Sequence, residues 1–313
     1  EMRQALCECL DEMMAENENI VVIDADLAKP NGTFPLRKKY PERAIDVGIA
    51  EQNMASVAAG MSSYGFIPFI TSFTPFASRR ICDQIAISIA YAKQNVKIIG
   101  SDPGISAEFN GGTHMSMEDI GVLRSIPELV IYEPVDVAQF KQALPQIVAY
   151  EGPVYIRMFR KTIDDVFTNA DYKFDLFHAD CIQEGNAVTI FCSGIMVQET
   201  MKANEILKQE GIDAEIINIH TIKPIDRDAV VASAKKTGAV VVAENHNVIG
   251  GLTSAVCEVL MEEYPVPLRA VGVKDRFGQV GKMPFLKEEY HMTAKDIVSA
   301  VKEVIKLNTS TLR

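Results

Sequence analysis

Short runs of β-branched and apolar residues alternate along the chain with longer segments in which apolar residues recur every three or four positions. The runs in the first half predict strands buried on both faces, at 19–24, 66–71, 96–100, 128–134 and 153–159. The segments between them predict helices, at 51–65, 75–94, 116–126 and 136–151. Such alternation is typical of a doubly wound α/β domain, in which helices cover both faces of a parallel sheet.

The alternation stops in a polar, weakly periodic stretch and then resumes. It predicts further strands at 187–194, 213–222 and 238–245, a helix ending near Gly211, another after Asp226, and a last helix from Thr293. We therefore expect two doubly wound α/β domains of unequal size. The expected boundaries are 1–160 for the first domain, 161–186 for an interdomain linker and 187–313 for the second domain.

Charge and composition exclude several classes of protein. The net charge of −11 argues against a surface for nucleic acid or anionic membranes. No apolar run is long enough to cross a bilayer. The acidic start lacks the features of a signal peptide, and Glu1 cannot be a natural initiator, so the N-terminus is expected upstream or at Met2. The six cysteines are irregularly spaced, which predicts reduced thiols in a cytoplasmic protein and no metal site.

Polar stretches follow the predicted strands, where open α/β sheets bind ligands. The two most suggestive are 24–34 and the glycine-rich 101–119, in which Ser116 and Asp119 have the spacing of a capping box. Gly111-Gly112 invites a phosphate-binding interpretation, but neither a P-loop nor a dinucleotide fingerprint is present. Gly250-Gly251 is better explained by close packing of a helix on a sheet.

Glu51 is the one charged residue between Asp46 and Arg79. It has two interpretations from the residues alone. It can be an ordinary acid in the first turn of a helix, where the helix dipole stabilises it by about 0.3–1 kcal/mol. It can also be a carboxyl in an apolar pocket that exchanges a proton with a ligand. Phe73 and Phe76, three positions apart at an expected helix start, read by default as core packing.

Three ordered stretches change this assessment. "DVGIAEQNM" at 46–54, "PFITSFTPFASRRICDQI" at 68–85 and "GGTHMSMEDIGVLRSIPELVIYEPVD" at 111–136 resemble the transketolase family, as do the later "ENH" and "GGLTSAV". The resemblance runs from about Arg3 to the end. It covers the pyrimidine-binding and C-terminal domains, but not the domain that holds the diphosphate and Mg²⁺ of thiamine diphosphate with a Gly-Asp-Gly signature. The chain thus resembles the C-terminal subunit of a split transketolase, and an N-terminal-type partner subunit is expected to hold Mg²⁺.

The resemblance also implies roles at the cofactor. Glu51 would bind N1′ of the aminopyrimidine and move a proton there, which needs a carboxyl shielded from water and from other charges. Phe73 and Phe76 would enclose the flat pyrimidine ring. Asp26 matches an acid near the cofactor.

Further residues match sugar contacts. His114 matches a catalytic histidine that contacts the hydroxyl and carbonyl oxygens of the sugar, and Arg3 and Arg160 match arginines that bind its phosphate tail. The chain departs from the family pattern at Asp102, where a phosphate-binding His is usual, and at Asn110, where an Asp reads the C2 hydroxyl. A phosphate-binding Ser is replaced by Pro30. Because Asp102 would repel a phosphate dianion, we expect a sulfonated, branched or unphosphorylated sugar.

The expected activity is reversible transfer of a two-carbon ketol unit from a ketose to an aldose. The chain would act in an α₂β₂ assembly whose core is a dimer of this chain, with active sites between subunits. Two alternatives stay open at this point. One is the β subunit of a 2-oxo acid dehydrogenase, which shares the fold and the Glu, and the other is a non-catalytic scaffold subunit.

Overall fold

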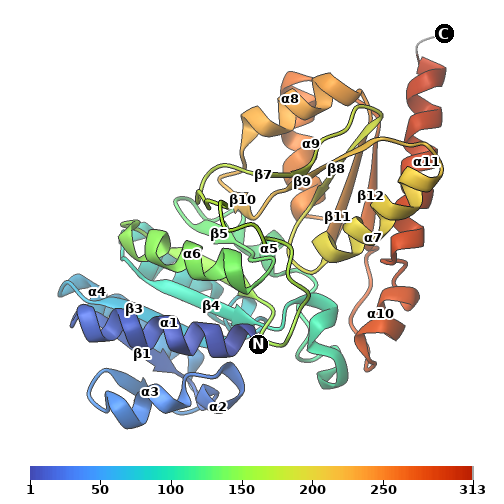
Figure 1. Ribbon diagram of the computed structural model, residues 1–313. Coiled ribbons are helices and arrows are strands. Elements are labelled where there is room, and N and C mark those ends of the chain that lie inside the picture. Colours follow the sequence, from blue (N-terminus) through green and yellow to red (C-terminus); the bar gives the residue numbers. More distant parts are fainter. Residues whose placement is uncertain (312–313) are drawn as a thin grey trace.

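Two sheets organise the computed structural model, which describes residues 1–311 (Figure 1). The fold is the predicted pair of α/β domains. The last two residues of the predicted second domain, 312–313, lie outside the described part of the chain.

The first sheet has seven strands in the order β10-β5-β6-β4-β3-β1-β2. All its neighbouring strands are parallel except β10, which runs antiparallel to β5. The strands are β1 (Ile20–Asp24), β2 (Ala44–Asp46), β3 (Ile67–Phe73), β4 (Lys97–Ser101), β5 (Val130–Tyr132), β6 (Val154–Met158) and β10 (Thr221–Lys223). Every residue of β1, β4, β5 and β6 is buried, as continuous apolar runs covered on both faces require.

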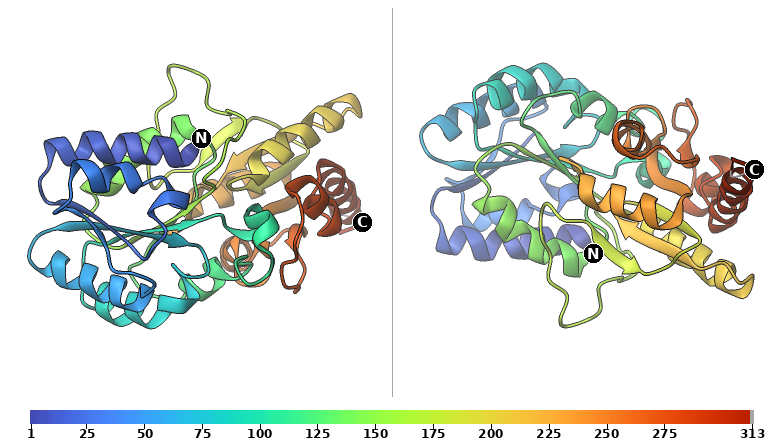
Figure 2. Two further views of the ribbon diagram at one scale, coloured as in Figure 1. Left: turned by 90° about the horizontal axis from the view of Figure 1, so that it is seen from below. Right: turned by 90° about the horizontal axis from the view of Figure 1, so that it is seen from above.

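Helices cover both faces of this sheet, as the two views of Figure 2 show. On one face lie α1 (Met2–Glu16) and α6 (Val137–Ala149), and on the other α4 (Glu51–Ser63) and the π-helix η2 (Gln84–Tyr91). In α1 the buried side chains Met2, Leu6, Leu10 and Met14 recur at helical spacing. Burying such a side chain contributes about 1.5–3 kcal/mol, so packing on the sheet stabilises this helix.

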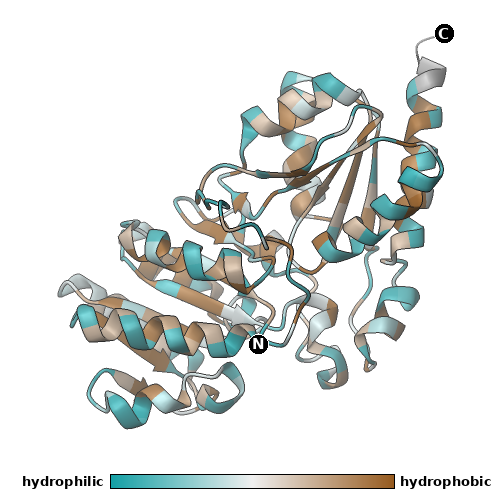
Figure 3. Cartoon of the chain, viewed as in Figure 1, coloured by the Kyte–Doolittle hydropathy of each residue, from teal (hydrophilic) through white to brown (hydrophobic). Residues whose placement is uncertain are grey.

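The second sheet has five strands in the order β12-β11-β8-β9-β7, with only β7 antiparallel to its neighbour among the described strands. Its strands are β7 (Asp180–Gln183), β8 (Val188–Cys192), β9 (Ala214–Asn218), β11 (Val240–Asn247) and β12 (Leu268–Val273). The helices packed on it are α7 (Met196–Gln209), α8 (Arg227–Thr237), α9 (Leu252–Glu263) and α11 (Ala294–Thr311). The apolar strands and the polar outer faces of the helices stand out in Figure 3.

The remaining elements are short and lie mostly in the loops between strands and helices. They are α2 (Ala28–Asn31), α3 (Phe34–Lys39), the 3₁₀ turns η1 (Arg79–Ile81) and η3 (Gly104–Asn110), α5 (Asp119–Leu123) and α10 (Met283–Glu289).

Several expectations about individual elements were wrong. The predicted strand 213–222 is two strands, β9 in the second sheet and β10 in the first. The predicted helix 75–94 is a turn followed by η1 and η2. The segment 161–186 contains a strand, β7, at the edge of the second sheet. Helix α5 begins at Asp119 after Glu118, so Ser116 does not cap it, and the buried Ser116 hydroxyl has no partner in the described residues.

A buried cluster of charges joins the two domains. Arg157 on β6 is fully buried and donates to both carboxylate oxygens of Asp119, at 2.8 and 3.1 Å, and to Glu133 at 2.5 Å. It also donates to the backbone carbonyl of Asn245 in the second domain at 2.7 Å. Although burial opposes a charge there, the two carboxylates raise the pKa of Arg157. Glu133 also accepts from Ser193 at 2.7 Å, so the cluster fixes the second domain against the first.

Candidate functional site

The candidate site lies at the carboxyl edge of the first sheet, where four neighbouring parallel strands end. These are β1, β3, β4 and β6, and the loops after them carry Asp26, Phe76, Asp102 and Arg160. Because parallel strands end at one edge, loops far apart in the sequence meet there. The loops from the blue, cyan and green parts of the chain converge at this edge in Figure 1.

Glu51 is the first residue of α4 and is almost completely buried, with 4% of its surface exposed. It is therefore a first-turn acid that is shielded from water, but it is not shielded from other charges as expected. Its Oε1 accepts a hydrogen bond of 2.6 Å from Nη1 of Arg80. The guanidinium carbon of Arg80 lies 3.8 Å from the centre of the Phe76 ring.

Three aromatic rings stand together beside this pair. The ring centres of Phe73 and Phe76 are 6.3 Å apart, and His114 lies 6.1 Å from Phe73 and 5.2 Å from Phe76. Phe73 ends β3 and Phe76 lies in the turn that follows, so the two do not share a helix face as expected. Both rings are only partly buried, unlike core aromatics, and can present a face to a ligand.

His114 adds a titratable ring to this group. Its Nδ1 lies 2.9 Å from the hydroxyl of Thr113, which leaves Nε2 free of a protein partner in the described part of the chain. A neutral imidazole can present either a donor or an acceptor to a sugar oxygen.

Arg160 and Asp102 form an ion pair at the same edge. Asp102 is 1% exposed and the side chain of Arg160 is 14% exposed. Arg160 also donates to the Pro30 carbonyl at 3.1 Å, and its guanidinium carbon lies 5.1 Å from the centre of Phe73. Burial raises the pKa of Asp102, and the adjacent guanidinium offsets only part of this shift.

Arg3 reaches the same neighbourhood through its backbone. Its N–H donates to the Arg160 carbonyl at 3.0 Å, while its side chain pairs with Glu1 at 2.8 Å and is 36% exposed. A Cβ at Gly32 would lie 2.6 Å from the Arg3 carbonyl, so a glycine is required for this close approach.

Asp26 is exposed and has a left-handed backbone (φ 60°). Its N–H donates to the Asp46 carboxylate at 3.0 Å, which leaves the side chain of Asp26 exposed above the buried end of β1. Sequence reasoning missed a buried residue at that end, Asp24, which is 1% exposed and accepts from Arg37 at 2.8 Å. Arg37 also pairs with Asp46. The signal was available, because a strand buried on both faces that ends in an acid needs a counter-charge.

Asn110 is exposed on the loop that follows β4, and this loop contacts the second domain. Glu108 pairs with Lys161 and accepts from the N–H of Met283 at 3.0 Å. A Cβ at Gly112 would lie 2.5 Å from the Gly278 carbonyl. The Gly111-Gly112 pair therefore serves close packing of the loop against the second domain.

The second glycine pair has the same explanation. The N-terminal amides of α9 at Leu252 and Thr253 donate to Glu244 at 2.7 and 3.0 Å, so a protein carboxylate caps this helix. A Cβ at Gly251 would lie 2.0 Å from Glu244. Burial raises the pKa of Glu244 to about 7. His246 is fully buried and contacts the backbone of Gly121 and Asn247.

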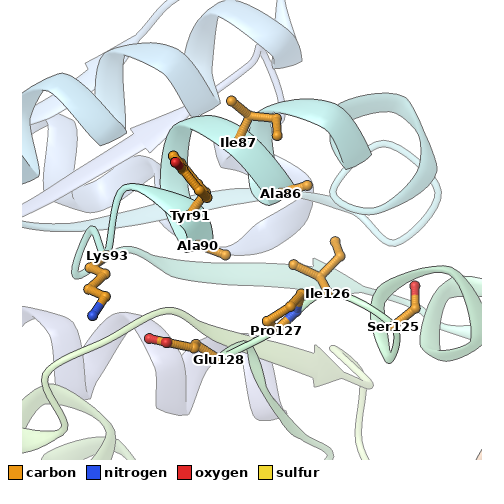
Figure 4. Close-up of a pocket in the computed structure, with 9 residues that line it drawn as sticks. All are labelled: Ala86, Ile87, Ala90, Tyr91, Lys93, Ser125, Ile126, Pro127 and Glu128. Carbon is orange, nitrogen blue, oxygen red and sulfur yellow. The ribbon is translucent and has the colours of Figure 1, made fainter.

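Two other features lie away from this edge. Cys181, Glu184 and Glu215 have ligand atoms within 4.8 Å of one another, but Lys236 pairs with both of these carboxylates and offsets their charge. A groove of about 510 Å³ lies between η2 and the segment that precedes β5, as Figure 4 shows. Within residues 1–311, no helix is long and apolar enough to cross a membrane.

Comparison with known proteins identifies both halves of the chain. Residues 1–164 match the model of the transketolase pyrimidine-binding domain, and residues 178–297 match that of the transketolase C-terminal domain. A solved structure described as a split-gene transketolase, inactive beta4 tetramer, superposes with a TM-score of 0.89 at 43% identity and covers 98% of both chains.

Two relatives are informative about substrates. The chain is 53% identical over 303 residues to the 6-deoxy-6-sulfo-D-fructose transketolase subunit SqwH of Clostridium sp. (strain MSTE9), covering 97% of this chain and 94% of that one. It is 31% identical over 304 residues to an apulose-4-phosphate transketolase subunit of Phocaeicola vulgatus (strain ATCC 8482), covering 97% of both.

Proposed function

Since the chain belongs to the transketolase family, whose activity is ketol transfer, we propose that it forms the half of a thiamine diphosphate site that binds the aminopyrimidine. The observation that carries the proposal is the buried Glu51 carboxyl, whose partner Arg80 lies over the partly buried ring of Phe76. A carboxyl shielded from water suits proton exchange with a ring nitrogen, and a phenyl face suits a flat heterocycle. When bound, the cofactor would supply the carbanion chemistry that breaks and forms the carbon–carbon bond.

The chain's own residues then have distinct roles. Glu51 holds the proton exchanged at N1′ of the pyrimidine, and Phe73 and Phe76 exclude water from the ring. His114, which borders both rings, positions the sugar oxygens and exchanges protons with them. Asp26 is assigned to the cofactor and Asn110 to the sugar hydroxyls in this proposal, and both are exposed on segments that follow strands of the first sheet.

The diphosphate and Mg²⁺ are assigned in this proposal to an N-terminal-type partner subunit. Large apolar side chains near the site support a partner surface there, since such residues are costly to leave in water. Ile49, Phe109 and Phe277 are 77%, 63% and 90% exposed. Ile49 precedes Glu51, and Phe109 and Phe277 come from the loops that meet at Gly112.

A second copy of the chain is the proposed partner at the groove of Figure 4. Ile87 and Tyr91, which line it, are 58% and 84% exposed, and Tyr64 at the end of α4 is 87% exposed. This apolar face lies on η2 and the end of α4, on the opposite side of the first sheet from α1 and α6. A tetramer of the similar split-gene transketolase is consistent with self-association.

The proposed donor is a sulfonated ketose, and the charge at the tail site supports this choice. A sulfonate carries one negative charge, whereas a phosphate carries up to two near neutral pH. Asp102 offsets the charge of Arg160, so the pair presents less positive charge than an unpaired arginine and suits the monoanion better. The relative with 53% identity is named for a sulfonated fructose. Arg3 is proposed to swing from Glu1 onto the same tail.

The test uses the complex captured from its own cells. Native mass spectrometry should find a second chain, thiamine diphosphate and Mg²⁺. The complex should transfer a ketol unit from 6-deoxy-6-sulfofructose with a higher kcat/KM than from fructose 6-phosphate. Glu51→Ala should abolish turnover while leaving the assembly intact.

Other results would favour the alternatives. Unchanged turnover with Glu51→Ala would favour the scaffold alternative, and activity on a 2-oxo acid alone would favour the dehydrogenase alternative. A phosphate donor preferred over the sulfonate would contradict the proposed substrate without contradicting the cofactor site.

A further inference from the structure

Arg80 makes both of the contacts that are proposed for the aminopyrimidine. One is with the Glu51 carboxyl and the other is with the face of the Phe76 ring. The Nη1 of Arg80 donates to Oε1 of Glu51 at 2.6 Å, and its flat guanidinium lies 3.8 Å from the centre of the Phe76 ring. The neighbouring Arg79 pairs with Glu118 instead. Of the two adjacent arginines, only Arg80 contacts the proposed cofactor site.

A guanidinium and an aminopyrimidine share the relevant geometry. Both are planar, both carry N–H groups in their plane that can meet a carboxyl, and both can stack on a phenyl face. The two groups cannot occupy the face of Phe76 and the Oε1 of Glu51 at the same time. The exchange also reverses the hydrogen bond, because Glu51 accepts from Arg80 but would donate to the unprotonated N1′.

We propose that Arg80 is a placeholder that fills the pyrimidine pocket of this chain and moves out when the cofactor ring enters. The inference rests on the proposed function, since it assumes that the pocket takes this ring. It adds that binding is a displacement, in which part of the interaction between cofactor and protein replaces an existing contact.

The placeholder can leave readily. Although Glu51 is 5% exposed at its side chain, that of Arg80 is 42% exposed, so rotation carries the guanidinium into water. Its side chain has no acceptor other than Glu51 in the described part of the chain. An ion pair exposed on one side and a stacked cation are each weak, so displacement should cost only a modest part of the binding energy.

The pairing also protects the pocket. A buried carboxylate without a partner is costly, and Arg80 supplies that partner while no ring is bound. Arg80 keeps Phe76 and Glu51 in the arrangement that the ring needs, which preserves the site until the N-terminal-type partner and the cofactor arrive.

The test measures binding of 4-amino-5-hydroxymethyl-2-methylpyrimidine, the ring without thiazolium or diphosphate, to the full-length chain by calorimetry and ligand-observed NMR. Arg80→Met removes the planar cation and keeps an apolar stem. It should bind the probe roughly fivefold to tenfold more tightly than the wild type. Arg79→Met is the matched control and should leave the affinity unchanged. Glu51→Ala should weaken binding of the probe, whether it is introduced into the wild-type chain or into the chain that carries Arg80→Met.

The outcomes separate the two proposals. If Arg80→Met binds the probe no more tightly than the wild type, while Glu51→Ala still weakens binding, the placeholder is wrong and the pyrimidine site stands. If none of the variants binds millimolar probe, the pyrimidine site fails and the placeholder fails with it. Thermal unfolding of each variant checks that the compared chains are folded.

Discussion

Two arginines at the end of strand β6 show how burial and pairing decide what a charged residue can do. Arg157 is fully buried, and two carboxylates and a backbone carbonyl accept its hydrogen bonds. Arg160, three positions later, is 14% exposed and pairs with one acid, Asp102. The hydrogen bonds of Arg157 all go to groups within the cluster that joins the two domains. Arg160 is partly exposed at the carboxyl edge of the first sheet, where a ligand can reach it. The first is structural and the second is the one proposed to bind substrate.

The largest effect is expected on stability, from Arg157→Met. The substitution leaves Asp119 and Glu133 buried without their counter-charge, which should lower the free energy of unfolding by about 3–5 kcal/mol. Urea unfolding followed by circular dichroism measures it. A loss below about 1 kcal/mol would contradict the view that this cluster holds the domains together.

Arg160→Met should affect the activity more than the stability. We expect the free energy of unfolding to fall by about 1–3 kcal/mol, less than for Arg157→Met, because only one buried acid, Asp102, loses its partner and its pKa is already raised. The kcat/KM for 6-deoxy-6-sulfofructose should fall roughly tenfold to a hundredfold, the value of a hydrogen bond to a charged group. Fructose, which lacks an anionic tail, is the control donor and should show no such fall. An equal fall for fructose would mean that Arg160 does not act on the tail.

Asp102→Asn sharpens the comparison by making Arg160 an unpaired cation. The ratio of kcat/KM for fructose 6-phosphate to that for 6-deoxy-6-sulfofructose should rise, by roughly threefold to tenfold, since the more positive site favours the dianion. The measurement is competition between the two donors in one reaction. A ratio that stays unchanged would remove the charge argument for a sulfonated substrate.

The smallest effect is the pH dependence of stability at this pair. Burial raises the pKa of Asp102 above its ordinary value, so the folded chain holds that proton more tightly than the unfolded chain. The corresponding stabilisation is present below the ordinary carboxyl pKa and is lost as pH rises through the raised value. Asp102→Asn should therefore gain stability relative to the wild type as pH rises from about 4 towards neutrality, in urea unfolding at several pH values.

Local sequence patterns predicted most of the sheet but not its edges. The strands between 19 and 159, except the short edge strand β2, were recognisable because continuous apolar runs mark parallel strands buried on both faces. Strand β10 was not, because the break between Asn218 and Thr221 leaves the run of apolar residues almost uninterrupted. Which sheet a three-residue strand joins depends on contacts far away in sequence.

The site shows a similar division. Some of the residues that the family resemblance assigned to one site lie close in space, since Phe73 is near both His114 and Arg160. Arg157 was overlooked, although a charged residue within a strand expected to be buried is a readable signal of a buried counter-charge. The contact of Arg80 with Glu51 joins positions 29 apart and depends on the turn after β3, which the sequence suggested was helical.

Strand β10 has a consequence for how the chain can be divided. It belongs by sequence to the second domain but pairs with β5 in the first sheet, and Lys223 is anchored to the carbonyls of Arg124 and Ile126. A chain cut in the linker would leave β5 as an uncovered sheet edge, which invites association with other strands. The two halves are therefore poor modules for recombination between relatives. An exchange of C-terminal domains should keep residues 221–223 matched to the first sheet they complete.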